Sequence, residues 1–158
     1  MAHTDTRPSV PAGVPSEPPR EAKIVVDRTG RIALAAVRVT IGLLWLVNAG
    51  WKRPPDFGEE QGRGLYRFTR EAVDHEVLAP FSWVVEEIVL PNFRVFGWAV
   101  LLTEAALGAF LLLGLFTRFW ALVGVAQSLA IALSVLNAPN EWPWSYYLMV
   151  AANLALFA

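Results

Sequence analysis

The sequence of 158 residues contains no cysteine and only two histidines, His3 and His75. The absence of cysteine excludes disulfides, thiolate metal sites, iron–sulfur ligation and thiol redox catalysis within this chain. A b-type haem in a helix bundle ordinarily takes imidazole ligands from the helices, and only His75 lies outside the amino-terminal tail. We therefore expect that this chain alone binds no haem and no metal.

Charged residues are also scarce, at 17% of the chain, and 13 Lys and Arg nearly balance 14 Asp and Glu. A net charge of -1 provides no basic surface for a nucleic acid, so nucleic-acid binding is excluded. Apolar residues are abundant instead, since 55% of the chain is hydrophobic and the mean hydropathy is +0.43. Long runs without charge leave too little polar surface for a soluble domain, and they indicate a membrane protein.

The amino-terminal segment has a different composition from the rest. Residues 1–22 carry five prolines among Ser, Thr, Gly and charged residues. Such a segment buries too little apolar surface to offset the entropy of ordering it, so we predict a disordered tail. It also lacks the order of a cleaved signal peptide, because the first long apolar run starts only after Arg31. Residues 23–158 are expected to form one membrane domain.

Four apolar runs predict membrane-spanning helices, because about 20 apolar residues cross a hydrocarbon core about 30 Å thick. Arg38 is the only charged residue in the first run, and Glu104 is the only one in the second. The predicted fold is an all-α membrane protein, a bundle of four transmembrane helices in the lipid bilayer. The four spans cover about residues 32–50, 95–116, 119–138 and 142–158.

The connection between the first two spans is predicted to form a helical cap over residues 65–90. Its first half predicts a partly solvated helix, because opposite charges lie four residues apart in the pairs Arg67 and Glu71, Arg70 and Asp74, and Glu71 and His75. Residues 81–90 repeat apolar side chains at helical spacing between Pro80 and Pro91, which predicts a short separate helix at the membrane surface. His75 is interpreted as a surface ion-pair partner rather than a metal ligand.

The orientation in the cell membrane depends on the positive-inside bias. Lys and Arg are nearly equal in number on the two sides, so two short connections decide. The Thr117-Arg118 connection is positive, whereas residues 137–143 contain Glu141 and neither Lys nor Arg. This pattern predicts a cytoplasmic amino terminus.

Glu104 lies near the middle of the second predicted span. A charged side chain at that depth costs at least about 2.5 to 3.5 kcal/mol, so it calls for a chemical or structural role. Arg38 is expected to lie about 10 Å inside one membrane surface, where its long side chain can reach toward Glu104. Glu104 and Arg38 are therefore the candidate catalytic residues, either as a proton-handling site or as a structural ion pair. The other polar groups within the spans are interpreted as hydrogen-bonding partners between helices: Asn48, Gln127, Ser128, Tyr146, Tyr147 and Asn153.

The second span and the connection after it read LTEAALGAFLLLGLFTR from Leu102 to Arg118, which resembles the signature of the DoxX family. NAGWK at 48–52 and LPN at 90–92 are similar to its DoxD-like branch, which includes the DoxD subunit of thiosulfate:quinone oxidoreductase. The resemblance implies a small four-helix membrane protein. In some members of the family it implies a quinone-reactive subunit, and in others a membrane partner of soluble redox or detoxifying enzymes.

Three functional hypotheses remain open. The first is an accessory or anchor subunit of a larger redox-linked membrane complex, which the absence of cofactor ligands favours. The second is a quinone-reactive subunit, with Glu104 and Arg38 near the quinone headgroup and Trp51 and Trp98 beside its ring. The third is a small transporter, which the single deep carboxylate and the lack of paired broken helices make weaker. If redox chemistry occurs, its electrons must come from a partner or a diffusible carrier.

Overall fold

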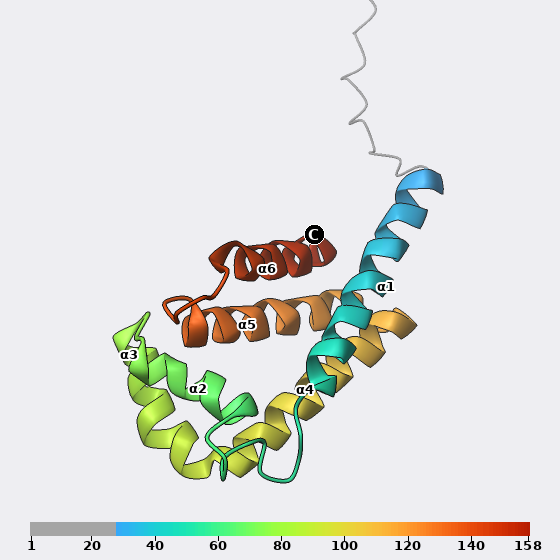
Figure 1. Ribbon diagram of the computed structural model, residues 1–158. Coiled ribbons are helices and arrows are strands. Elements are labelled where there is room, and N and C mark those ends of the chain that lie inside the picture. The colour runs from blue at the N-terminus through green and yellow to red at the C-terminus, as the bar shows by residue number, and fades with distance from the viewer. Residues whose placement is uncertain (1–27) are drawn as a thin grey trace, which may run out of the picture.

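The computed structural model describes residues 28–158, and the tail predicted at residues 1–22 lies outside this range. Within the described range every regular element is helical (Figure 1), which confirms the all-α class. The elements are α1 (Arg28–Gly50), α2 (Gly64–Asp74), α3 (Ala79–Val84), a π-helical segment η1 (Val85–Val89), a 3₁₀ turn η2 (Leu90–Asn92), α4 (Phe93–Leu113), α5 (Thr117–Val135) and α6 (Pro143–Phe157).

Three helical segments are long and apolar enough to cross a membrane, namely Arg28–Gly50, Ala79–Leu113 and Thr117–Val135. They correspond to the first three predicted spans. α6 is shorter, with 15 residues. At 1.5 Å per residue it extends about 22 Å, less than the thickness of the hydrocarbon core. The bundle of four spans is therefore not shown, and the fourth span stays a prediction.

The long helices form two antiparallel pairs, α1 with α4 and α5 with α6 (Figure 1). Glycines let the first pair approach closely. A Cβ atom on Gly108 would overlap the side chain of Leu46 and lie 2.9 Å from the carbonyl oxygen of Gly42. A glycine at position 108 thus allows α1 and α4 to pack closely. α4 ends at Gly114, whose left-handed φ of 72° suits a glycine at a helix terminus.

Two apolar clusters form the core. One consists of Ile41 and Trp45 of α1 with Leu107 and Leu111 of α4, and partly buried side chains of α5 and α6 pack against it. The other joins α4 to α2 and to the loop after α1 through Phe57, Leu65, Phe93 and Val100. Glu104 lies on α4 between Val100 of one cluster and Leu107 of the other. The boundary between the clusters is therefore the place where α4 carries a charge.

The first half of the cap agrees with the prediction. α2 holds all three expected ion pairs, Arg67 to Glu71 at 3.4 Å, Arg70 to Asp74 at 3.5 Å and His75 to Glu71 at 3.4 Å. The His75 interpretation as an ion-pair partner is confirmed.

The second half of the cap differs, because the separate short helix predicted at 81–90 was wrong. α3 runs through η1 and η2 into α4 as one curved helical segment (Figure 1). Pro80 lies in the first turn of α3, where its missing N–H is not needed. At Pro91 the helix changes to π and 3₁₀ bonding, which accommodates a second missing donor. The prediction of a separate helix assumed that each of these prolines ends a helix.

α3 and η1 pack against α2, where the Ser82 hydroxyl donates to the carbonyl oxygen of Ala72 at 2.6 Å. Glu86 and Glu87 are exposed. The loop between α1 and α2 is held by Phe57, which is 1% exposed, fills the space beside Gly97 and meets the ring of Trp98 edge-on at 5.6 Å. This loop carries Lys52 into the interior.

Candidate functional site

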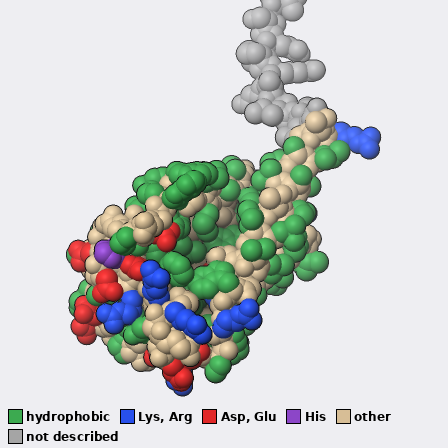
Figure 2. Space-filling model, in the orientation of Figure 1, with side chains coloured by type: hydrophobic (Ala, Val, Ile, Leu, Met, Phe, Trp, Pro, Cys, Tyr) green, Lys and Arg blue, Asp and Glu red, His purple; other side chains and the backbone are tan. Residues whose placement is uncertain are grey.

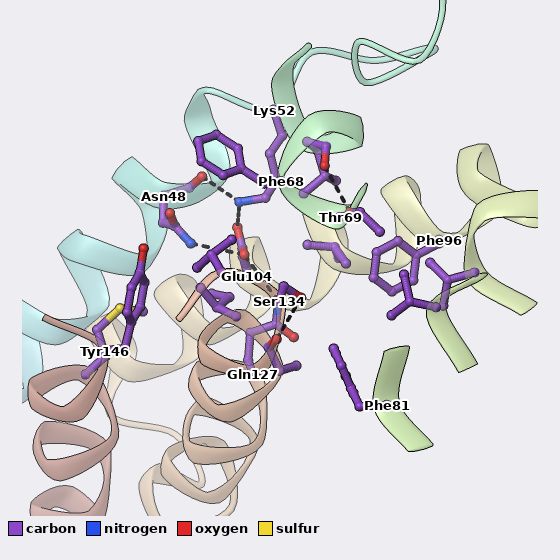
Figure 3. Close-up of a pocket in the computed structure, with 18 of the residues that line it drawn as sticks. Asn48, Lys52, Phe68, Thr69, Phe81, Phe96, Glu104, Gln127, Ser134 and Tyr146 are labelled. Atoms are coloured by element: carbon purple, nitrogen blue, oxygen red, sulfur yellow. Dashed lines mark hydrogen bonds and ion pairs between the residues drawn. The ribbon is translucent and has the colours of Figure 1, made fainter. Parts of the chain in front are cut away.

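Glu104 forms the centre of a buried polar cluster. Its side chain is fully buried, with 0% exposure. Lys52 Nζ lies 2.5 Å from Glu104 Oε2, and Oε1 accepts from Asn48 Nδ2 at 3.1 Å and from Gln127 Nε2 at 3.3 Å. Figure 3 shows the three donors converging on this carboxylate. Side chains from α1, the following loop and α5 therefore meet on one residue of α4.

Lys52 is the cation of this cluster. It follows α1 directly and is 5% exposed. Its ammonium also donates to the carbonyl oxygen of Asn48 at 2.9 Å and lies 4.4 Å from the ring centre of Trp51. Burial lowers the pKa of Lys52 below its usual value, while the Glu104 carboxylate opposes this shift. The ammonium thus gives up a proton more readily than a lysine in water does.

The expected pair of Arg38 and Glu104 was wrong. Arg38 lies instead at the other end of α4, where its guanidinium covers Gly114 so closely that a Cβ there would overlap Nη1. The antiparallel register explains the difference, because α1 places Asn48 beside Glu104. Arg38 lies ten residues before Asn48, about 15 Å away along the helix. A long side chain cannot bridge that distance.

A cavity of about 550 Å³ adjoins the polar cluster. Apolar side chains from six helical segments form most of its wall, among them Phe68, Phe81, Val85, Phe96, Ile131 and Met149. Its polar groups come from the cluster and from a few further residues: Asn48, Lys52, Thr69, Glu104, Gln127, Ser134, Glu141 and Tyr146. The cavity is therefore mostly apolar, with ionisable side chains at the polar cluster and at Glu141.

A second polar pair lies on the wall of the same cavity. Tyr146, in the first turn of α6, donates its hydroxyl to the carboxylate of Glu141 in the connection before that helix. Both residues line the cavity and are partly buried. The neighbouring Tyr147 is 61% exposed and does not line it.

The two tryptophans predicted beside a quinone ring lie in different environments. Trp51 lines the cavity and donates its indole N–H to Asn48 Oδ1 at 3.2 Å. Trp98 is not among the lining residues, because it packs outward against Phe57 and is 45% exposed. The structure thus brings Trp51, but not Trp98, to the cavity that Glu104 adjoins.

Three residues of the cluster were not recognised from the sequence as site residues. Lys52 was interpreted only as a charge flanking a span. Asn48 and Gln127 were predicted to form hydrogen bonds between helices, and both do so with Glu104. A signal was present, because Asn48 and Lys52 are four residues apart and face the same side of a helix. Both also belong to the NAGWK segment that carried the family resemblance.

Among residues 28–158, no group of three or more His, Asp or Glu side chains is arranged to hold a metal ion. The buried side-chain N and O atoms in this range all have hydrogen-bond partners. The arrangement is suited to hold a neutral or weakly polar ring by hydrogen bonds and to exchange protons with it.

Comparison with known proteins gives one match. The sequence model of the family described as TQO small subunit DoxD matches residues 63–158, more than half of the chain. Glu104, Gln127 and Tyr146 lie within the matched residues, whereas Asn48 and Lys52 precede them. No curated protein and no solved structure matches.

Proposed function

The chain belongs to the family of DoxD, the small subunit of thiosulfate:quinone oxidoreductase (TQO), and from this membership we propose that it binds a membrane quinone in the cavity beside Glu104 and Lys52. The observation that carries the proposal is a buried ion pair that faces a cavity. Two charges removed from water cost several kcal/mol each, and an apolar pair of similar size is often as stable. A purely structural pair has no need of an adjoining cavity.

The residues present fit a quinone. Its ring oxygens accept hydrogen bonds, and Lys52, Asn48 and Gln127 offer donors on one part of the wall. Phe68 and Trp51 supply aromatic surface near these donors. The remaining aliphatic and aromatic wall suits an apolar tail, and about 550 Å³ lies within the range of small-molecule sites.

The chemistry that a bound quinone supplies is the uptake of two electrons and two protons. Lys52 would donate a hydrogen bond to a ring oxygen and polarise it. Glu104 accepts a hydrogen bond from the Lys52 ammonium, and the proton of this pair would pass to that oxygen. The chain has no cysteine for a redox centre, so the electrons come from thiosulfate or from another subunit of the complex.

We further propose that α6 is the fourth span. Its first turn lies near the cap, because Asn137 in the preceding connection donates to the carbonyl oxygen of Glu76 at 2.8 Å. Its far end returns to the start of α5, where Arg118 donates to the backbone oxygen of Ala158 at 3.5 Å. α6 therefore lies antiparallel to α5 and extends back to the start of that helix. The predicted cytoplasmic amino terminus places the cap on the outer side.

An accessory or anchor subunit is the competing function, and the charged cap supports it. Figure 2 shows Lys, Arg, Asp and Glu side chains gathered over the cap, whereas the helices beside it are covered by hydrophobic side chains. Such a cap can bind a larger subunit. An anchor, however, requires no ligand in the cavity.

Binding of decyl-ubiquinone to the full chain in detergent tests the proposal, measured by quenching of tryptophan fluorescence. We expect saturable one-to-one binding that weakens about 10- to 100-fold in Lys52→Met, the loss for a hydrogen bond from a charged donor. Arg53→Met, which removes an exposed cation from the next position, is the matched control and should bind as the native chain does. Circular dichroism verifies that each variant is helical. Absence of saturable binding would overturn the proposal and leave the anchor function.

A further inference from the structure

The Tyr146 and Glu141 pair is not used by the site proposed above. Both residues line the cavity, but they come from α6 and the connection before it, whereas Lys52, Asn48 and Glu104 come from the α1 and α4 pair. The cavity thus has proton-bearing groups on walls built by both helix pairs. In Figure 3 the Tyr146 side chain stands apart from the group gathered around Glu104.

Ion pairing does not explain Glu141. Within the described part of the chain, no Lys, Arg or His forms a salt bridge with its carboxylate. Its partner is the Tyr146 hydroxyl, a donor that can rotate toward another acceptor. Glu141 is partly exposed, unlike the fully buried Glu104. Glu141 therefore can exchange protons with water directly.

We propose that Tyr146 binds the second ring oxygen of the quinone and that Glu141 renews its proton, an inference that rests on the proposed function. A 1,4-quinone carries its two oxygens on opposite edges of the ring, and its reduction to a quinol adds one proton to each. Donors on one wall reach only one of these oxygens. Lys52 and Glu104 serve the first, and Tyr146 serves the second.

Reduction of the bound quinone to a quinol takes up two electrons and two protons. The electrons come from thiosulfate through the complex, and the second ring oxygen forms a bond to the hydroxyl proton of Tyr146 as the Tyr146 O–H bond breaks. The Glu141 carboxylate takes a proton from water at the surface of the connection, and the resulting carboxyl group passes this proton to the phenolate oxygen of Tyr146. Tyr146 is thus a catalytic residue, and Glu141 acts through it.

Infrared spectroscopy of bound decyl-ubiquinone, labelled with ¹³C at one ring carbonyl, tests this inference without turnover. Each hydrogen bond lowers the stretching frequency of the carbonyl that accepts it, and the label separates the two bands. In Tyr146→Phe we expect one band to return to the frequency of the free quinone while the other stays. In Lys52→Met the opposite band should return. Tyr147→Phe, on the exposed neighbour, should move neither band.

The outcomes separate the two proposals. If Lys52→Met moves one band and Tyr146→Phe moves none, the Tyr146 inference fails and quinone binding at Lys52 stands. If Tyr146→Phe moves both bands, Tyr146 shapes the whole site rather than one hydrogen bond, and the inference also fails. If the native chain binds no quinone, the proposed function itself fails.

A second measurement addresses Glu141. Reduction of the bound quinone at an electrode should change carboxyl absorption at two residues, and Glu141→Gln should remove one of these signals while both carbonyl bands stay in place. A Glu141→Gln spectrum identical to that of the native chain would overturn the role of Glu141 as the proton source.

Discussion

Lys52 and Glu104 determine the chemistry of the cavity, because they are the buried charges that face it. The Lys52 ammonium and the Glu104 carboxylate form an ion pair, and Asn48 and Gln127 donate further hydrogen bonds to the carboxylate. Removal of one charge leaves the other buried without a counterion, whereas removal of both leaves an apolar site. This asymmetry separates the contribution of the pair to stability from its contribution to binding.

We predict that Lys52→Met and Glu104→Leu each lower the free energy of unfolding by about 3 to 5 kcal/mol, as expected for a broken buried pair. The double variant should recover most of this loss, because no charge remains buried. Unfolding in mixed detergent, followed by circular dichroism, measures all three. Decyl-ubiquinone binding should nevertheless weaken in all three variants, including the double variant whose stability is restored. Additive losses in the double variant would show that the two side chains do not interact.

For single residues, the sequence predicted the buried carboxylate of Glu104 but not Lys52, the cation that pairs with it. A lone carboxylate within an apolar run is visible from composition alone. Its partner depends on the register of α1 against α4, which Gly42 and Gly108 set by close contact. The membrane depth estimated from the predicted span boundaries favoured Arg38 as the partner. In the structure α1 ends beside Glu104, so Lys52, just beyond the last turn of α1, forms the ion pair instead.

Among the helices and loops, two contacts hold Lys52 where it is. The glycine contact between α1 and α4 fixes the register of the helix that precedes it. The packing of Phe57 fixes the loop that follows it. Substitutions at either contact should therefore disturb the position of Lys52, although the substituted residues do not belong to the site.

Gly108→Ala tests the helix contact. The new Cβ would overlap Leu46 and press on the carbonyl oxygen of Gly42, so we expect a loss of about 1 to 3 kcal/mol in stability, as for overpacking. Decyl-ubiquinone binding should weaken as Asn48 moves away from Glu104. Gly50→Ala is the matched control, because nothing lies within 4 Å of its Cβ position. Both variants gain the same helix propensity, so equal stabilities would contradict the contact.

Phe57→Ala tests the loop. A side chain 1% exposed is removed from the space between Gly97 and Trp98, and such a truncation costs about 3 to 5 kcal/mol. Phe119→Ala, at a position 59% exposed, should cost much less. Thermal unfolding in detergent measures both. A loss in Phe57→Ala no larger than that in Phe119→Ala would show that the loop is held by other contacts.

The helices themselves were largely predictable, because an apolar run of this length with at most one charged residue has few alternatives to a helix in a membrane protein. The joining of α3 to α4 was not, since Pro80 and Pro91 stop a regular α-helix but not one that changes its hydrogen-bond pattern. Whether a proline ends or only bends a helix depends on tertiary packing, here that of Ser82 and Val85 against α2.

At the scale of the whole molecule, the cavity lies at the cap end of the bundle. Lys52 and Glu141 line it together with residues of α2 and α3. The turn between α4 and α5 lies at the other end of these helices (Figure 1). A ligand dissolved in the bilayer and protons from water would therefore meet near one membrane surface. If the proposed function is correct, the side of the membrane that this surface faces decides where the protons are taken up.

We predict that the cap and the α5–α6 connection lie on one side of the membrane and the α4–α5 turn on the other. Glu87→Cys, Pro139→Cys and Arg118→Cys each place one thiol at an exposed position in a chain that has none. A membrane-impermeant maleimide added to intact cells should label the first two, and Arg118→Cys should react only after the membrane is opened. Labelling of Arg118→Cys together with Glu87→Cys from outside would contradict the crossing of α4. Labelling of Pro139→Cys on the same side as Arg118→Cys would contradict the crossing of α5. Lys52 and Glu141 would then lie on opposite sides of the membrane, which is incompatible with the cavity that both residues line.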